Sequence, residues 1–357
     1  MDYSYKFPVV KGIQARKPYY IAMVPLKMIS KLFPAEEEYV PPEYRAQRKL
    51  NESRIPEISK YITNNPDSYV FSALAASIDG EFHFIESESG IGTGILEISM
   101  DARLLINDGQ HRKAAILDAI NENRSLENET ISVVLYEDQG LSRSQQMFTD
   151  LNKHAVKTSN SIAELYDSRD SLAVTVRNTI SKIPFLNEYV DKERDILGKF
   201  SSSLFTLNTF YNASKKILRR GKCDSEFEKF LYSFWSSVSN HMLPWIELER
   251  KELSKKDLRE SYVATQAIII QAFGKVGAYL WENKIKHVEA KIKKIEKINW
   301  KRSSKAWKTR VTRNDGRIIS NENSILLASN YIKECIGIPL SEDESAAEKK
   351  YKTLIGE

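Results

Sequence analysis

The pattern of apolar residues changes near residue 159, and this change constrains the fold more than any other feature. Before it, short runs of apolar, aromatic and small residues lie between turn or polar residues, which is typical of strands. After it, apolar residues recur at spacings of three and four, and glycine and proline are scarce, which indicates helices. We therefore predict an α+β protein, with a mixed α/β domain over residues 1–158 and a mainly helical domain over residues 159–357.

The individual elements follow from the same patterns. In the first domain we expect strands at 19–24, 68–77, 95–100, 104–107 and 131–136, and helices at 45–62, 110–120 and 142–151. Pro56 should mark a helix start or a break. In the second domain we expect helices at 162–176, 202–219, 225–238, 253–281 and 284–298. The glycine-rich residues 90–94 lack the Lys-Ser/Thr of a P-loop, so we interpret them as a turn.

The composition excludes several classes of protein. Hydrophobic residues make up 41% and charged residues 28% of the 357 residues, as in folded globular proteins. The two cysteines, Cys223 and Cys335, have no metal-ligand spacing, so we expect no metal site. Lys and Gln interrupt the most apolar window, 263–280, which indicates a buried helix rather than a membrane span. No continuous apolar stretch follows the first residues, so we expect a cytoplasmic protein.

The positive charge is concentrated in one segment. Residues 281–317 contain 13 Lys or Arg and 4 Asp or Glu, a balance of 13 − 4 = +9, whereas the whole chain carries only +5. Two tryptophans lie among these cations, and such a mixture suits a nucleic-acid backbone. The alternative is a solvated helix face followed by a loop with two core tryptophans. The predicted DNA contacts of this segment are Trp300, Lys301, Arg302, Lys305, Trp307, Lys308, Arg310, Arg313 and Arg317.

The most informative segment is 104–116, LLINDGQHRKAAI, in which an apolar strand runs through a polar turn into a helix. Asp108 can cap the helix, and Gly109 permits close approach of the backbone. The first-turn N–H groups, together with His111 and Arg112, then suit a phosphate. The predicted phosphate-binding residues are Asp108, Gly109, Gln110, His111, Arg112 and, from a later segment, Lys153. Alternatively, Asp108 only caps, His111 only packs, and Arg112 pairs with a carboxylate to fix the turn.

Three arginines in the basic helix of the first domain, Arg45, Arg48 and Arg54, are further candidate DNA contacts.

Residues 108–112, Asp-Gly-Gln-His-Arg, resemble the DGQHR signature of a family that includes DndB. The turn is also similar to that of the ParB/sulfiredoxin superfamily, in which a helix N-terminus holds nucleotide phosphates. Supporting resemblances lie at 45–55, 61–62, 69–71, 148–153 and 331–332, and at Trp300 and Trp307. The resemblance implies a ParB/sulfiredoxin-like core with a helical extension, and a role in DNA phosphorothioation. Members of this kind are regarded as regulators that bind the promoter of the modification genes. The sequence departs from the ParB pattern in one respect, because it contains no clear helix-turn-helix recognition module.

We therefore expect a transcriptional regulator that binds double-stranded promoter DNA, with no assigned catalytic residue. One alternative is an enzyme, either an ATPase or a DNA nickase, with His111 and Asp108 as its reactive groups and a nucleoside triphosphate as its ligand. Another is an adaptor for other phosphorothioation proteins. Whether the chain forms a homo-oligomer stays open.

Overall fold

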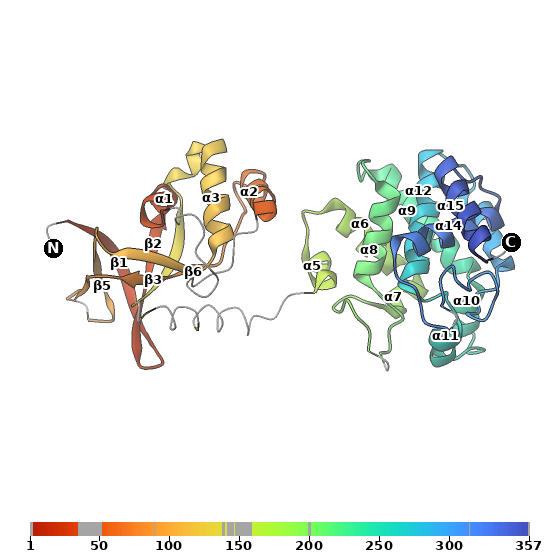
Figure 1. Ribbon diagram of the computed structural model, residues 1–357, viewed down its shortest axis with the longest axis horizontal. Coiled ribbons are helices and arrows are strands. Elements are labelled where there is room, and N and C mark those ends of the chain that lie inside the picture. Colours follow the sequence, from red (N-terminus) through yellow and green to blue (C-terminus); the bar gives the residue numbers. More distant parts are fainter. Residues whose placement is uncertain are drawn as a thin grey trace. The chain divides into compact units, whose positions relative to one another are not determined.

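We describe the protein from a computed structural model, in which residues 3–34, 52–88, 90–137, 140, 146, 159–198, 201–313 and 315–355 are described. The chain divides into two compact units, residues 1–156 and 157–357, and each is treated by itself. Figure 1 shows a sheet with helices in the first unit and an almost entirely helical second unit.

The first unit is built on a seven-stranded sheet. Its strands are β1 (Ser4–Gln14), β2 (Lys17–Pro25), β3 (Leu74–Asp79), β4 (Phe82–Glu86), β5 (Thr93–Ser99), β6 (Arg103–Asp108) and β7 (Thr130–Glu137). Their order in space is β4-β5-β1-β2-β7-β3-β6. Strands β3 and β7 pair in parallel, and the other described pairs are antiparallel. Strand β6, which leads into the DGQHR turn, therefore lies at the edge of the sheet beside β3.

Three described helices of this unit pack on one face of the sheet (Figure 1). They are α1 (Ile29–Leu32), α2 (Ile55–Thr63) and α3 (Gln110–Glu122), with short 3-10 turns at Leu26–Met28, Glu52–Arg54 and Arg124–Asn128. Side chains alternate along the strands, as the pleat requires. In β2, Ala22 and Val24 are buried in the core below the helices, whereas Ile21 and Met23 on the other face are exposed.

The second unit is helical apart from a two-stranded parallel pair, β8 (Val190–Asp191) with β9 (Phe205–Thr206). Its first helices are α5 (Asn160–Tyr166), α6 (Ser171–Lys182), α7 (Pro184–Tyr189), α8 (Leu207–Leu218), α9 (Ser225–His241) and α10 (Leu243–Glu249). They are followed by α11 (Lys255–Ser261), α12 (Ala267–Glu282), α13 (Val288–Ile292), a 3-10 turn at Lys293–Lys297, α14 (Glu322–Ile336) and α15 (Glu342–Ile355).

Helix α12 is the central element of this unit, because ten of its 16 residues are buried. It packs closely on α8. A methyl group added at Gly274 would lie 2.6 Å from the carbonyl oxygen of Ala213, so glycine is required for this approach. Phe273 of α12 also contacts Trp300, with ring centroids 6.0 Å apart. The long apolar window of the sequence is thus a core helix.

The predicted α+β class is confirmed, and strands or helices occupy most of the predicted segments. The specific ParB/sulfiredoxin-like arrangement of the first domain stays a prediction. The predicted domain boundary, 158/159, lies at the edge of a segment outside the described residues, as does the predicted helix at 142–151.

Several predicted bounds were wrong. Strand β3 begins at Leu74 rather than at residue 68, and strands β1 and β4 were not predicted. The single helix expected at 253–281 is two helices, α11 and α12, separated at residues 262–266. Likewise, Asp167–Asp170 separates α5 from α6 in the stretch expected as one helix, because Asp170 caps α6 by accepting from the N–H groups of Leu172 and Ala173. Only a short α13 and a 3-10 turn occupy 284–298, where Lys284 and His287 have positive φ.

Candidate phosphate and nucleic-acid site

The DGQHR segment forms a strand, a tight turn and a helix. Strand β6 ends at Asp108, Gly109 has φ +104°, and the 13-residue α3 begins at Gln110. A Cβ atom at residue 109 would lie 2.4 Å from Cδ2 of Leu74, and this φ disfavours L-residues. The turn therefore requires glycine on two separate grounds.

Asp108 does not cap α3, which corrects the expectation from the sequence. The N-cap is Gly109, and no side chain caps this helix. The Asp108 carboxylate instead pairs with the guanidinium of Arg112, four residues later. The uncapped N–H groups of the first turn keep the positive end of the helix dipole.

Arg112 fixes the turn, as the alternative interpretation held. Its Nη1 donates to the carbonyl oxygens of Ser72 and Ala73, at 2.8 and 2.9 Å, and to the Ser72 hydroxyl. Its Nη2 donates to Asp108, and the side chain is only 17% exposed. Arg112 thus binds β6 and α3 to the segment that leads into β3, which leaves little of its fork for a phosphate.

His111 lies in the first turn of α3 and within electrostatic reach of Arg54. Two causes lower the pKa of His111 below its usual value: first partial burial, and second the positive charge of Arg54. This shift favours the neutral form of the imidazole. Helices α2 and α3 pack together and bring Arg54, a candidate DNA contact, near this turn. Lys113 donates to the carbonyl oxygen of Pro34 at 3.1 Å. Arg45, Arg48 and Lys153 lie outside the described residues.

The two tryptophans of the basic segment are core residues, so the expectation that they contact DNA is corrected. Trp300 is 2% and Trp307 0% exposed, and their rings stack with centroids 5.4 Å apart. Trp307 Nε1 donates to the carbonyl oxygen of Asn299 at 2.7 Å. Neither indole is accessible to a nucleic-acid base.

Arg310 and Arg302 also have structural partners. Arg310 is 5% exposed and forms a bidentate pair with Glu348, with N–O distances of 2.6 and 2.7 Å. Arg302 donates to the carbonyl oxygens of Tyr262, at 3.1 Å, and Arg259, at 2.5 Å. Arg310 therefore joins α15 to the basic segment and is not on the surface, and Arg302 holds the end of α11.

The remaining predicted cations of this segment are exposed. They are Lys301, Lys305, Lys308, Arg313 and Arg317. Arg317 lies 3.5 Å from Asp315, an ion pair of exposed side chains that water screens. Of the nine residues predicted as DNA contacts, these five cations are therefore the ones exposed to solvent.

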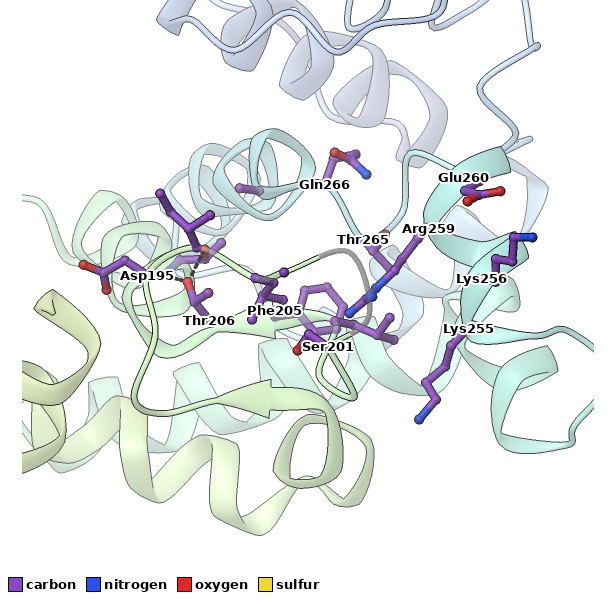
Figure 2. Close-up of a pocket in the computed structure, with 16 residues that line it drawn as sticks. Asp195, Ser201, Phe205, Thr206, Lys255, Lys256, Arg259, Glu260, Thr265 and Gln266 are labelled. Carbon is purple, nitrogen blue, oxygen red and sulfur yellow. Dashed lines mark hydrogen bonds between the residues drawn. The ribbon is translucent and has the colours of Figure 1, made fainter.

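A cavity of about 650 Å³ in the second unit contains none of the predicted site residues. The segments around 195–209 and 255–267 line it (Figure 2). Three cations of this cavity, Lys255, Lys256 and Arg259, were not predicted as site residues. A continuous helix over 253–281 would have placed them on an ordinary solvent-exposed face. The break between α11 and α12 is what brings them to a cavity.

The described residues lack two further features. No helix among them is long and apolar enough to cross a membrane. In the same residues, no group of three or more His, Cys, Asp or Glu could hold a metal ion.

No curated protein and no solved structure matches this sequence. A family model does match it, over residues 7–339 of the 357. The match includes both the DGQHR turn and the basic segment, and it covers nearly the whole chain. The chain therefore belongs to the DndB family, described as DNA-sulfur modification-associated.

Proposed function

We propose that this protein binds double-stranded DNA as a transcriptional regulator of the DNA phosphorothioation gene cluster. The observation that carries the proposal is the exposure of Lys301, Lys305, Lys308, Arg313 and Arg317 on the one segment with a strong positive charge. The family, described as DNA-sulfur modification-associated, supports a DNA partner. Cations of this kind bind backbone phosphates, so most of the affinity should depend on salt.

Buried residues give this surface a fixed frame. Trp300 and Trp307 anchor one end of the segment in the core, and the Arg310–Glu348 pair anchors the next turn. Exposed cations between such anchors lose less conformational freedom on binding than those of a loose tail would. The proposed contacts are therefore those five cations, without the indoles, Arg302 or Arg310.

The test is a salt titration of DNA binding with matched variants. The full chain is titrated with the DNA upstream of its own gene cluster and with scrambled DNA of equal length, with and without ATP. In one variant the five cations are changed to Gln, and in the control five exposed lysines elsewhere are changed to Gln. The control residues are Lys182, Lys222, Lys229, Lys349 and Lys350.

We expect the upstream DNA to be preferred regardless of ATP. Neutralisation of the five cations should lower the salt slope by about 4.5, since each phosphate contact contributes roughly 0.9. The control variant should retain the wild-type slope. Equal slopes in the two variants would contradict the proposed surface, and equal affinity for both DNAs would contradict a regulator.

One observation favours a second candidate, a phosphate-handling enzyme. Burial and the charge of Arg54 lower the pKa of His111 in the first turn of α3, which has no side-chain cap, and this favours the neutral imidazole that can accept a proton. The predicted partner, Asp108, is paired with Arg112 and is less available. An ATPase or nickase of this design should lose turnover on His111→Ala while DNA affinity stays within twofold. Absence of ATP hydrolysis and nicking in the wild type would remove this candidate.

A further inference from the structure

The cavity of the second unit combines three features that favour an anion. It is lined by the loop after β8, the start of α8, helix α11 and the segment that leads into α12. Figure 2 shows Lys255, Lys256, Arg259 and Glu260 on α11, with Thr265 and Gln266 on the segment that follows.

The first feature is the N-terminus of α12. This helix has 16 residues, its N-cap is Gln266, and no side chain caps it. Gln266 and Ala267 both line the cavity. The first-turn N–H groups and the positive end of the helix dipole are therefore placed at the cavity wall, where an anion is stabilised.

The second feature is the hydroxyl of Thr265. Thr265 lines the cavity and is only 7% exposed, and its Oγ1 has no hydrogen-bond partner among the described residues. A buried hydroxyl without a partner is costly, so such groups usually have one in a native protein. A ligand oxygen at the start of α12 would supply it.

The third feature is the set of cations on α11. Lys255 and Lys256 are exposed at the cavity, and Arg259 is half-buried there, with one of its nitrogens donating to the carbonyl oxygen of Ser203. Of the two acidic residues that line the cavity, Asp195 is already committed. Its oxygens accept from the N–H groups of Asn160 and Ser161, each at 2.8 Å.

The remaining acidic residue is Glu260, so cations outnumber the uncommitted carboxylates at this cavity. The wall also has an apolar part. Ile196 is 86% exposed, and Leu197 next to it is half-buried. A volume of about 650 Å³ is that of a small-molecule site, with room for more than inorganic phosphate.

We propose that this cavity binds a nucleoside phosphate, with the phosphate at the N-terminus of α12 and the base toward Ile196 and Leu197. The Thr265 hydroxyl and the Lys255, Lys256 and Arg259 side chains would hold the phosphate. The same chemistry could be met by a phosphate of DNA. The small molecule is favoured because the cavity is lined by an apolar part as well as by cations.

The test is calorimetric titration of the full chain with ATP, AMP and pyrophosphate, and with a short DNA duplex. The site variants are Lys255→Gln with Lys256→Gln, and Thr265→Val. The matched control is Lys222→Gln with Lys229→Gln, which removes the same charge from exposed positions of the same unit that do not line the cavity. A further variant, His111→Ala, tests the turn of the first unit.

We expect ATP to bind the wild type and the control with equal affinity. The paired lysine variant should bind at least tenfold more weakly, and Thr265→Val several-fold more weakly. Loss of ATP binding in the His111 variant alone would overturn the proposal, because the nucleotide would then occupy the other unit. No binding of ATP, AMP or pyrophosphate would also overturn it.

The DNA arm separates the two sources of phosphate. If the duplex binds and ATP does not, and the lysine pair weakens the duplex more than the control does, the cavity binds DNA and the small-molecule proposal fails. This outcome is distinct from failure of the proposed regulator, which is tested on the five cations of the basic segment.

Discussion

Two helices in different units, α3 and α12, begin in the same way but in different surroundings. Neither has a side-chain cap, and both have cations nearby. At α3, Arg112 and Lys113 donate to carbonyl oxygens of the chain itself. At α12, Lys255 and Lys256 are exposed at a cavity. A cation beside a helix N-terminus therefore indicates an anion site only when the protein has not already used its donors.

The largest effect is expected for Arg112→Ala. The change leaves the Ser72 and Ala73 carbonyl oxygens without this donor and the Asp108 carboxylate without its ion pair. We expect a loss of about 3 kcal/mol in the free energy of unfolding of the first unit, from hydrogen bonds to a charged group. Denaturant titration measures this, with the exposed Arg124→Ala as the control. If Arg112→Ala were as stable as the control, Arg112 would be available to a ligand and the comparison would fail.

Gly109→Ala should have the next largest effect. The new Cβ lies too close to Leu74, and φ is unfavourable. Strain and overpacking together should cost about 2 kcal/mol. Gly90→Ala is the control, because Gly90 also has a positive φ but open space around the site of the Cβ. Thermal unfolding of both variants separates the two costs, and equal losses would show that the contact with Leu74 relaxes.

The same contrast explains how far the sequence could lead. The β6–turn–α3 segment was predicted because its residues are contiguous, and the local pattern contains the whole turn. The hydrogen bonds that stabilise this turn could not be predicted, because the partners of Arg112 lie about forty residues earlier, at Ser72 and Ala73. No local pattern identifies a carbonyl oxygen that a distant arginine will contact.

The basic segment shows the limit more clearly. Trp300, Trp307 and Arg310 have the composition of a nucleic-acid surface, yet burial against residues such as Tyr331 and Glu348 decides their role. Strand β1 was missed because Pro8 interrupts its pattern. The proline is tolerated within the antiparallel ladder opposite Ile95. The cavity at α12 could not be predicted, because it forms at the break between α11 and α12. The apolar spacing across 253–281 does not reveal this break.

A third helix, α5, is the opposite case, since the Asp195 carboxylate accepts from its first N–H groups. Glu164 is a residue of the same helix. Its pKa is raised from 4.5 to about 7, first by burial and then by the charges of Asp195 and Asp170. The folded state therefore binds this proton more tightly than the unfolded state does. The resulting stability is present below pH 4.5 and is lost as pH rises towards 7.

Glu164→Gln should remove this part of the pH dependence. Relative to the wild type, the variant should gain about 1 kcal/mol between pH 5 and pH 8, after allowance for the partial exposure of the Glu164 side chain. Melting curves across this range measure the difference. The exposed Glu252→Gln should follow the wild type. A parallel pH dependence in Glu164→Gln and wild type would show that the pKa of Glu164 is not raised in the folded protein.

The smallest effects are expected at two buried threonines of the cavity wall, Thr206 before α8 and Thr265 before α12. They compare the start of α12 with that of α8. Thr206 caps α8 by accepting from the N–H of Thr209, so Thr206→Val should cost about 1 kcal/mol. Thr265→Val removes a hydroxyl with no partner among the described residues, so the ligand-free protein should gain up to about 1 kcal/mol. Denaturant titration without nucleotide measures both changes in the free energy of unfolding, the loss at Thr206 and the gain at Thr265. A loss at Thr265 as large as that at Thr206 would mean that the hydroxyl already has a partner in the empty protein. In that case the start of α12 would resemble that of α3, where the protein satisfies its own groups.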